Sequence, residues 1–340
     1  MTKQEYIQQM PKIDLHCHLD GSLPVSTIRK LANNANIPIP DSETEFMNLI
    51  TVSQECTDLT EYLSRFHLPI ACLQSAENLF TASHDLLGEV SKENVVYLEV
   101  RFAPFLSVNE NLSLDGVIES VLQGLESGRR KFGVEYGVIL CALRNHPHKT
   151  NVQLVSAAVK YGERRVVALD LAGNEKTFAT QEHQTLFQEA VTAGIMFTIH
   201  AGEAAGPSSV WDAVALGAKR IGHGIAMKDD PDLVSFCRDN NIGIELCPTS
   251  NLQTKATSNW ESYPYPLFMT GGLPITINTD NRTVSKTTLT REFLQLDTQY
   301  DLDTKDLETL FKNAVDQSFT SDSQKRRLHG ALDKFKQQTL

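Results

Sequence analysis

The sequence contains no long hydrophobic run. No stretch of its 340 residues approaches the roughly 18 consecutive apolar residues that a membrane-spanning helix needs. The first residues, Met-Thr-Lys-Gln-Glu-Tyr, are polar and lack the apolar segment of a secretory signal. We therefore expect a cytoplasmic protein with no membrane partner.

Basic residues are too few for a polyanionic partner. The chain has 31 Lys and Arg residues against 42 Asp and Glu residues, which gives a formal net charge of -11. Nucleic-acid binding needs a clustered basic face. The nearest candidate, Lys325-Arg326-Arg327, lies in a segment of helical spacing, where a solvated helix face explains it. We expect no nucleic-acid partner.

Cysteine is also sparse. The six cysteines are scattered without a Cys-x-x-Cys pair, and several lie inside apolar runs. This distribution indicates reduced core residues rather than a disulfide framework. A hydrophobic content of 41% and a charged content of 21% describe a globular protein with an ample core.

Short apolar, β-branched runs alternate with stretches of helical spacing along most of the chain. This alternation is typical of repeated βα units and a parallel sheet. The eight runs are Ile13–His18, Val95–Phe102, Val134–Leu140, Val166–Leu171, Met196–His200, Arg220–His223, Ile242–Cys247 and Leu273–Asn278. They predict an α/β fold, a (β/α)8 TIM-type barrel. No linker rich in Gly, Ser or Pro divides the chain, so one domain over residues 1–340 is preferred to two smaller ones.

Two helical segments depart from the regular alternation. Apolar residues recur at helical spacing from Asp58 to Leu87, which predicts a helical insertion after the first strand. An insertion beside a barrel mouth often supplies a lid or a pocket wall. The tail from Arg291 onward is also of helical spacing, and we expect it to pack around the outside of the barrel.

The first apolar run carries two histidines two positions apart. Side chains at this spacing share one face of a strand, so His16 and His18 project together. Asp20-Gly21 follows as a turn, which places the pair at the carboxyl end of the strand. A chance His-x-His pair on a surface loop or a sheet edge is the alternative to a metal site.

Other predicted strands also end in polar residues. His200 ends the fifth run, His223 stands between two glycines at the end of the sixth, and Asp280 follows the eighth. An α/β barrel keeps its active site at the carboxyl ends of its strands, so these side chains are expected to meet. Three nitrogen donors and one oxygen donor suit Zn²⁺ with a position open for water. These donors are His16, His18, His200 and Asp280.

The remaining polar residues at strand ends admit more than one role. Glu203 is interpreted as an acid/base group, and the alternative is an exposed loop carboxylate. His223 is a further ligand, a base or a satisfied core histidine, and we favour a base or electrostatic role. Gly173 either lets the backbone approach a flat ligand or belongs to a plain βα turn. We expect the other histidines to occupy surface or lid positions: His67, His84, His146, His148, His183 and His329.

Taken in order, these motifs closely resemble those of the adenosine deaminase family of the amidohydrolase superfamily. They are His16-Cys-His18-Leu-Asp20-Gly, Asp170-Leu-Ala-Gly173-Asn-Glu, Ile199-His200-Ala-Gly-Glu203, Arg220-Ile-Gly-His223-Gly, Cys247-Pro-Thr-Ser-Asn251 and Asn278-Thr-Asp280. The match runs nearly end to end. The resemblance implies a (β/α)8 barrel that holds one zinc and replaces the purine 6-amino group with oxygen.

The resemblance also implies a role for individual residues. Zinc would lie on His16, His18, His200 and Asp280, with His18 also against the substrate. Glu203 would give a proton to the purine N1, and His223 would lie beside the attacking water. Asp20 would bind the ribose 5′ hydroxyl, and Gly173 would offer its backbone N–H to N3. Residues 58–66 would form the apolar gate of the family.

One position departs from the family pattern. Many members have a second aspartate after the zinc-binding one, which donates to the purine N7, and here Asn281 stands there. A carboxyl group donates only when protonated, whereas an amide donates at any pH. Adenosine and 2′-deoxyadenosine are the expected substrates. Deamination of adenine or a modified adenine is the alternative reaction. AMP is disfavoured as a substrate because no basic cluster accompanies the motifs. Outside the class of enzymes, the alternative is a non-catalytic zinc-containing binding protein.

Overall fold

The structure, a computed structural model, describes residues 1–53 and 56–339. Parallel strands form two four-stranded sheets of order β1-β2-β3-β4 and β5-β6-β7-β8. The strands are β1 Lys12–His18, β2 Val95–Phe102, β3 Glu135–Leu143, β4 Val166–Ala172, β5 Thr198–Ala201, β6 Arg220–His223, β7 Gly243–Leu246 and β8 Ile275–Ile277. Single parallel bridges, Leu169 to Phe197 and Cys17 to Asp280, join the two sheets into a ring. The predicted (β/α)8 barrel is confirmed.

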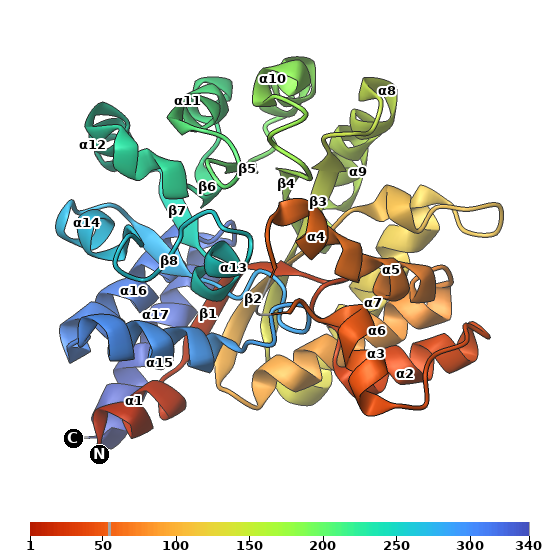
Figure 1. Cartoon of the computed structure of the whole chain (residues 1–340), viewed down its shortest axis with the longest axis horizontal. Helices are drawn as coiled ribbons and strands as arrows, with labels where there is room; N and C mark the ends of the chain where they lie inside the picture. The colour runs from red at the N-terminus through yellow and green to blue at the C-terminus, as the bar shows by residue number, and fades with distance from the viewer. Residues whose placement is uncertain (54–55, 340) are drawn as a thin grey trace.

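The strands are almost completely buried, polar side chains included, because helices cover their outer faces. Every residue of β5, β6, β7 and β8 is buried, as expected for parallel strands between a packed interior and a layer of helices. Figure 1 shows the helices arranged around the strands. Those between consecutive strands are α7 Leu114–Phe132, α8 His148–Asn151, α9 Gln153–Tyr161, α10 Gln184–Thr192, α11 Pro207–Leu216, α12 Pro231–Asp239, α13 Pro248–Gln253 and α14 Tyr265–Thr270.

Local signals set the ends of the longest of these helices. The Ser113 side chain accepts a hydrogen bond from the Gly116 N–H at the start of α7. At its other end Gly133 has φ of 76°, a left-handed conformation that glycine adopts without a steric penalty. The helix therefore ends at Gly133, just before β3 begins.

The insertion after β1 is a series of short helices rather than one long one. Its helices are α2 Val25–Asn34, α3 Glu43–Ile50, α4 Leu59–Leu63, α5 His67–Cys72 and α6 Ala76–Ser91. The helical spacing predicted from Asp58 to Leu87 is broken by a 3-10 turn at Ser64–Phe66 and by a new start at Ser75. Ser75 caps α6 by accepting a hydrogen bond from the Asn78 N–H, so its side chain begins a separate helix.

The carboxyl-terminal helices pack outside the barrel, as predicted. They are α15 Leu289–Tyr300, α16 Thr304–Gln317 and α17 Asp322–Thr339, and the amino-terminal helix α1 Lys3–Gln9 lies with them at the lower left of Figure 1. The rings of Tyr6 and Phe335 are 5.0 Å apart, which ties the first helix to the last.

The helices and the cysteines agree with two further predictions. Between residues 1 and 53 and from 56 to 339, no helix is long and apolar enough to cross a membrane. All six cysteines are buried and free, which confirms that they are core thiols.

Candidate metal centre and active site

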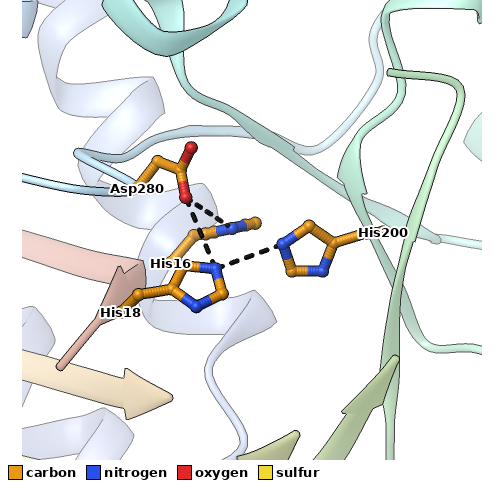
Figure 2. A group of neighbouring side chains, drawn as sticks. All are labelled: His16, His18, His200 and Asp280. Atoms are coloured by element: carbon orange, nitrogen blue, oxygen red, sulfur yellow. Dashed lines mark hydrogen bonds and ion pairs between the residues drawn. The ribbon is translucent and has the colours of Figure 1, made fainter. Parts of the chain in front are cut away.

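Four side chains converge at the carboxyl ends of the strands (Figure 2). His16 and His18 come from β1, His200 from β5 and Asp280 from the segment after β8. Their candidate ligand atoms all lie within 4.8 Å of one another. Asp280 Oδ1 is 3.4 Å from Nε2 of both His16 and His18. The structure thus brings together the four donors that the sequence proposed as one site.

Buried carboxylates fix the orientation of two of these imidazoles. Nδ1 of His16 lies 2.7 Å from Glu245 Oε2, and Nδ1 of His200 lies 3.1 Å from Asp170 Oδ1. A neutral imidazole that donates from Nδ1 carries a lone pair on Nε2. The Nε2 atoms of His16 and His200 are therefore ready to bind a cation.

The residues of this site fit a metal ion. His16 Nε2 is buried and has no hydrogen-bond partner. Nε2 of His18 lies 3.2 Å from Nε2 of His200, so two ring nitrogens face each other. Burial lowers the pKa of His18 well below its usual value, which favours the neutral, metal-binding form. A cation between these atoms would satisfy the orphaned nitrogen and the facing lone pairs together.

A buried ionic network lies beneath the cluster, and we call its residues Arg101, Asp170, Arg220 and Glu245 the floor. Arg101 donates to Asp170 at 3.1 Å and to Glu245 at 2.9 Å. Arg220 donates to Glu245 at 2.6 Å, and all four side chains are fully buried. Burial alone would raise the pKa of Glu245, but the two arginines hold it well below its usual range. The floor carboxylates therefore stay ionised.

Glu203 follows the strand that carries His200 and lies in a loop above the cluster, which the side chain of Glu175 holds in place. The side chain of Glu175 accepts hydrogen bonds from four consecutive backbone N–H groups, at Gly202, Glu203, Ala204 and Ala205. Burial, together with the nearby carboxylates, raises the pKa of Glu203 to about 8. In the metal-free site this pKa favours the protonated form at neutral pH, which is the form that a general acid requires.

The surroundings of His223 define its protonation. Asn251 Nδ2 lies 2.8 Å from His223 Nδ1, while Asn251 Oδ1 accepts from the Cys247 N–H and the Tyr263 hydroxyl. Nδ1 of His223 is therefore an acceptor, and the proton sits on Nε2, which faces Glu203 Oε2 at 3.6 Å. Burial lowers the pKa of His223 well below its usual value, so the ring is neutral.

Two residues of the site have a strained backbone. His223 has φ of 66° and Asp280 has φ of 57°, values rare for residues with a side chain. Such conformations cost of order 1–3 kcal/mol each and are found where the surrounding structure enforces them. Ser250 Oγ donates to Asp280 Oδ2 at 2.6 Å and helps to hold that side chain in place.

A cavity of about 400 Å³ opens above the cluster. Its walls include Leu59, Leu63 and Phe66 from the insertion, so the predicted pocket wall is confirmed. Among the described residues that line this cavity there is no lysine or arginine.

The residues proposed to bind substrate line the same cavity, and we call Asp20, Gly173 and Asn281 the rim. Asp20 Oδ1 is buried and accepts no hydrogen bond. Gly173 has φ of 108°, which favours glycine. Gly21 lies so close to Asn281 that an added Cβ would be 1.9 Å from Asn281 Oδ1, so only glycine leaves room for this side chain.

Two of the remaining histidines differ from one another in placement. His67 lines the cavity, which agrees with the expected lid position. His183 was expected in a surface or lid position, and this prediction is wrong: it is 7% exposed and does not line the cavity, and burial lowers its pKa to about 4. The polar 3-10 turn Thr180–His183 folds against the barrel, where a sequence without regular spacing gave no sign of burial.

Several residues position the site through roles that were not predicted from the sequence, although Glu175 and Asn251 stand in the quoted motifs. Glu245, Glu175 and Asn251 support His16, the Glu203 loop and His223 respectively. Glu245 had a visible signal, because a carboxylate inside the apolar run Ile242–Cys247 needs a buried partner. Asp170 stood in a recognised motif, but its contact with His200 was not foreseen.

Comparisons with known proteins agree with this architecture. The adenosine deaminase family profile matches residues 11–335. The chain is 41% identical over 331 residues to an adenosine deaminase from Enterococcus faecalis (strain ATCC 700802 / V583), an alignment that covers 97% of this chain and 98% of that protein. An adenosine deaminase from Clostridium botulinum (strain 657 / Type Ba4) is 40% identical over 323 residues, with 94% and 98% covered. The chain belongs to the adenosine deaminase family.

Solved structures share the fold at lower sequence identity. An adenine deaminase from Arthrobacter aurescens superposes with a TM-score of 0.89 at 24% identity, covering 96% of this chain and 99% of that one. A zinc-containing amidohydrolase from Burkholderia ambifaria gives a TM-score of 0.88 at 21% identity, covering 98% and 93%. The barrel, its insertion and its terminal helices are thus a shared architecture.

Proposed function

We propose that this protein catalyses the hydrolytic deamination of adenosine and 2′-deoxyadenosine to inosine and 2′-deoxyinosine, with release of ammonia. The observation that carries the proposal is the buried carboxyl group of Glu203 beside a four-donor metal cluster in one cavity. The relatives named adenosine deaminase, 41% and 40% identical over nearly the whole chain, support the same reaction.

The metal we propose is Zn²⁺, one ion per chain, held by His16, His18, His200 and Asp280. Three imidazoles and one carboxylate suit zinc, and an enzyme of the same fold from Burkholderia ambifaria contains it. When bound, zinc supplies an activated water at neutral pH.

Glu203 is the proton donor in this proposal. An aromatic purine is a poor electrophile at C6 until N1 receives a proton, and the raised pKa of Glu203 keeps a proton available there. Water then adds to C6 and the bond from C6 to the amino nitrogen breaks. Of the two water protons, one leaves with the amino group as ammonia and the other returns to Glu203. Glu175 holds the loop that aims the carboxyl group.

His223 acts as a donor rather than as a base. The contact from Asn251 leaves the proton on Nε2, so this atom has no lone pair with which to abstract a proton. The Nε2–H group is suited to orient the attacking oxygen and to stabilise the negative charge that develops on it.

The rim residues can hydrogen-bond to both the base and the sugar of a nucleoside. Asp20 accepts a hydrogen bond from the 5′ hydroxyl with its unpartnered Oδ1, Gly173 donates its backbone N–H to N3, and the Asn281 amide donates to N7. His18 lies against the substrate as well as on the metal. A phosphate would meet the Asp20 carboxylate and no lysine or arginine among the described cavity residues, which disfavours a nucleotide.

The proposed function also includes a cellular location and a single-domain organisation. We place it in the cytoplasm, where the six free, buried cysteines would remain reduced. We also propose that residues 1–340 form one domain, because the packing of Tyr6 on Phe335 joins the two end helices.

The test is the ultraviolet absorbance change with adenosine, 2′-deoxyadenosine, adenine and AMP, measured side by side on zinc-replete protein. We expect comparable kcat/KM for the two nucleosides and values at least about tenfold lower for adenine and AMP, since a hydrogen bond to a charged acceptor is worth roughly 1.5–3 kcal/mol. Equal rates with adenine would favour the adenine deaminase alternative. Binding without turnover of any compound would favour a non-catalytic protein.

A further inference from the structure

The insertion is fastened to the segment after β8 by a small apolar cluster. Its buried members are Val52, Cys56, Tyr62, Phe66 and Val284. The Val52 N–H also donates to the Val284 carbonyl at 2.9 Å. This contact brings α4, which carries Tyr62, next to the segment that carries Asn281.

Tyr62 places a hydroxyl at the edge of this apolar cluster. Its side chain is 1% exposed, and its Oη lies 2.6 Å from Ser285 Oγ. The hydroxyl also interacts with the side chains of Ser250 and Asn281. Burial raises the pKa of Tyr62 well above its usual value, so the phenol keeps its proton and has both a donor and an acceptor to offer.

The Asn281 amide needs a hydrogen-bond partner to fix its orientation, because one end of the amide is a donor and the other is an acceptor. The purine N7 is an acceptor, so only the Nδ2 end of the amide can bind it, and the Oδ1 end would repel it. The close approach of Gly21 confines the side chain to one place, yet Oδ1 has no hydrogen-bond partner that would choose between the two ends. Steric confinement alone therefore leaves the two orientations similar.

We propose that Tyr62 is a positioning residue that sets the orientation of the Asn281 amide and thereby the recognition of N7. The Tyr62 hydroxyl donates to Ser285 Oγ and accepts from one N–H of Asn281 Nδ2, so the second N–H of Nδ2 points into the cavity. The inference rests on the proposed function, because it requires Asn281 to contact the purine.

The arrangement also links the insertion to substrate selection. Tyr62 and Asn281 both line the cavity but come from α4 and from the segment after β8. The amide is oriented only while α4 is docked on that segment. Recognition of N7 is therefore a property of the closed cavity and not of Asn281 alone.

The experiment compares the product inosine and its analogue 7-deazainosine as inhibitors of adenosine turnover. Inosine has the N7 acceptor and 7-deazainosine does not, and an inhibition constant can be measured without turnover of either. The wild-type protein should bind inosine about tenfold more tightly. Tyr62→Phe keeps the ring in the apolar cluster and removes only the hydroxyl, so the preference should fall to about twofold or less, the range expected for loss of one neutral hydrogen bond.

Two further variants separate orientation from packing. Phe66→Leu disturbs the same cluster without touching the hydroxyl, and it should weaken both inhibitors by the same factor. In an Asn281→Asp background either oxygen of the carboxyl group can carry the proton, so adding Tyr62→Phe should change the preference for inosine by less than about twofold.

The outcomes distinguish this inference from the proposed function. Equal binding of inosine and 7-deazainosine by the wild-type protein would overturn the N7 contact and this inference together. A wild-type preference that survives unchanged in Tyr62→Phe would overturn this inference and leave the N7 contact standing. A preference lost in Tyr62→Phe but retained in Phe66→Leu supports the role of the hydroxyl.

Discussion

The floor and the rim of the cavity are built in opposite ways. In the floor, both oxygens of Glu245 accept hydrogen bonds, from His16 and Arg101 on one side and from Thr198 and Arg220 on the other. In the rim, Asp20 Oδ1 and Asn281 Oδ1 are buried without a partner. Both oxygens of this floor carboxylate therefore have partners without substrate, and these two rim oxygens do not.

This difference separates two tasks within one cavity. A buried charge is stable only when it is fully paired, so the floor holds the imidazoles in a fixed geometry at all times. A buried polar atom without a partner costs about 1–3 kcal/mol, and at Asp20 Oδ1 a hydroxyl group of the ligand can relieve this cost. The floor prepares the metal site, and the rim selects the molecule that completes it.

The largest expected effect comes from removing a donor above the floor. His200→Ala should weaken metal binding by more than about 100-fold, because even outer partners of a ligand are worth about 10–100-fold. Elemental analysis after dialysis measures this. Loss of metal from His223→Ala but not from Asp280→Ala would show that His223 binds the metal and that Asp280 does not.

Glu203→Gln should leave the floor intact and stop the chemistry. Glutamine matches the shape of the side chain but has no acidic proton, and positioned acid/base groups are worth about 10²–10⁴-fold in rate. We expect normal metal content and a loss in kcat of this order. Turnover close to that of the wild-type protein would remove Glu203 from the mechanism.

The pH dependence of kcat/KM tests the same proton. Burial raises the pKa of Glu203 to about 8 in the metal-free site, so the active, protonated form is present below that pH and is lost as pH rises through it. A bound cation lowers this pKa, which moves the alkaline decline to pH 8 or below. Residual activity of Glu203→Gln should lack that decline, and an identical decline in both proteins would assign it to another group.

Asp20→Ala acts on the rim alone and has a smaller expected effect. Removing the 5′ hydroxyl acceptor should raise KM for adenosine about tenfold to hundredfold, from the roughly 1.5–3 kcal/mol of such a hydrogen bond. The poorer reaction with adenine should be nearly unchanged. Equal losses on both compounds would mean that Asp20 supports the floor instead of binding the sugar.

The sequence was sufficient to predict the barrel and the convergence of its polar strand ends. Parallel strands of a barrel end at one face, so His16, His200 and Asp280 could be placed together although they are far apart in the chain. The insertion was predicted as helical, but its division at Ser64–Phe66 and Ser75 depends on local capping.

The supporting contacts could not be predicted in the same way. The pairing of Glu245 with His16 depends on the register between distant strands, and periodicity does not specify that register. The positive φ of His223 is enforced by its surroundings and not by its residue type. The contact of Tyr62 with Ser285 exists only because the insertion after β1 docks on the segment after β8.

The separation of floor and rim is tested most directly by metal retention in two variants during titration with a chelator. Asp170→Asn removes the floor carboxylate that orients His200, and Asp20→Ala removes a rim carboxylate. We expect Asp170→Asn to release its metal at about 10–100-fold lower chelator concentration than the wild-type protein, and Asp20→Ala to match the wild-type protein. Equal release from the two variants, whether early or late, would contradict the account.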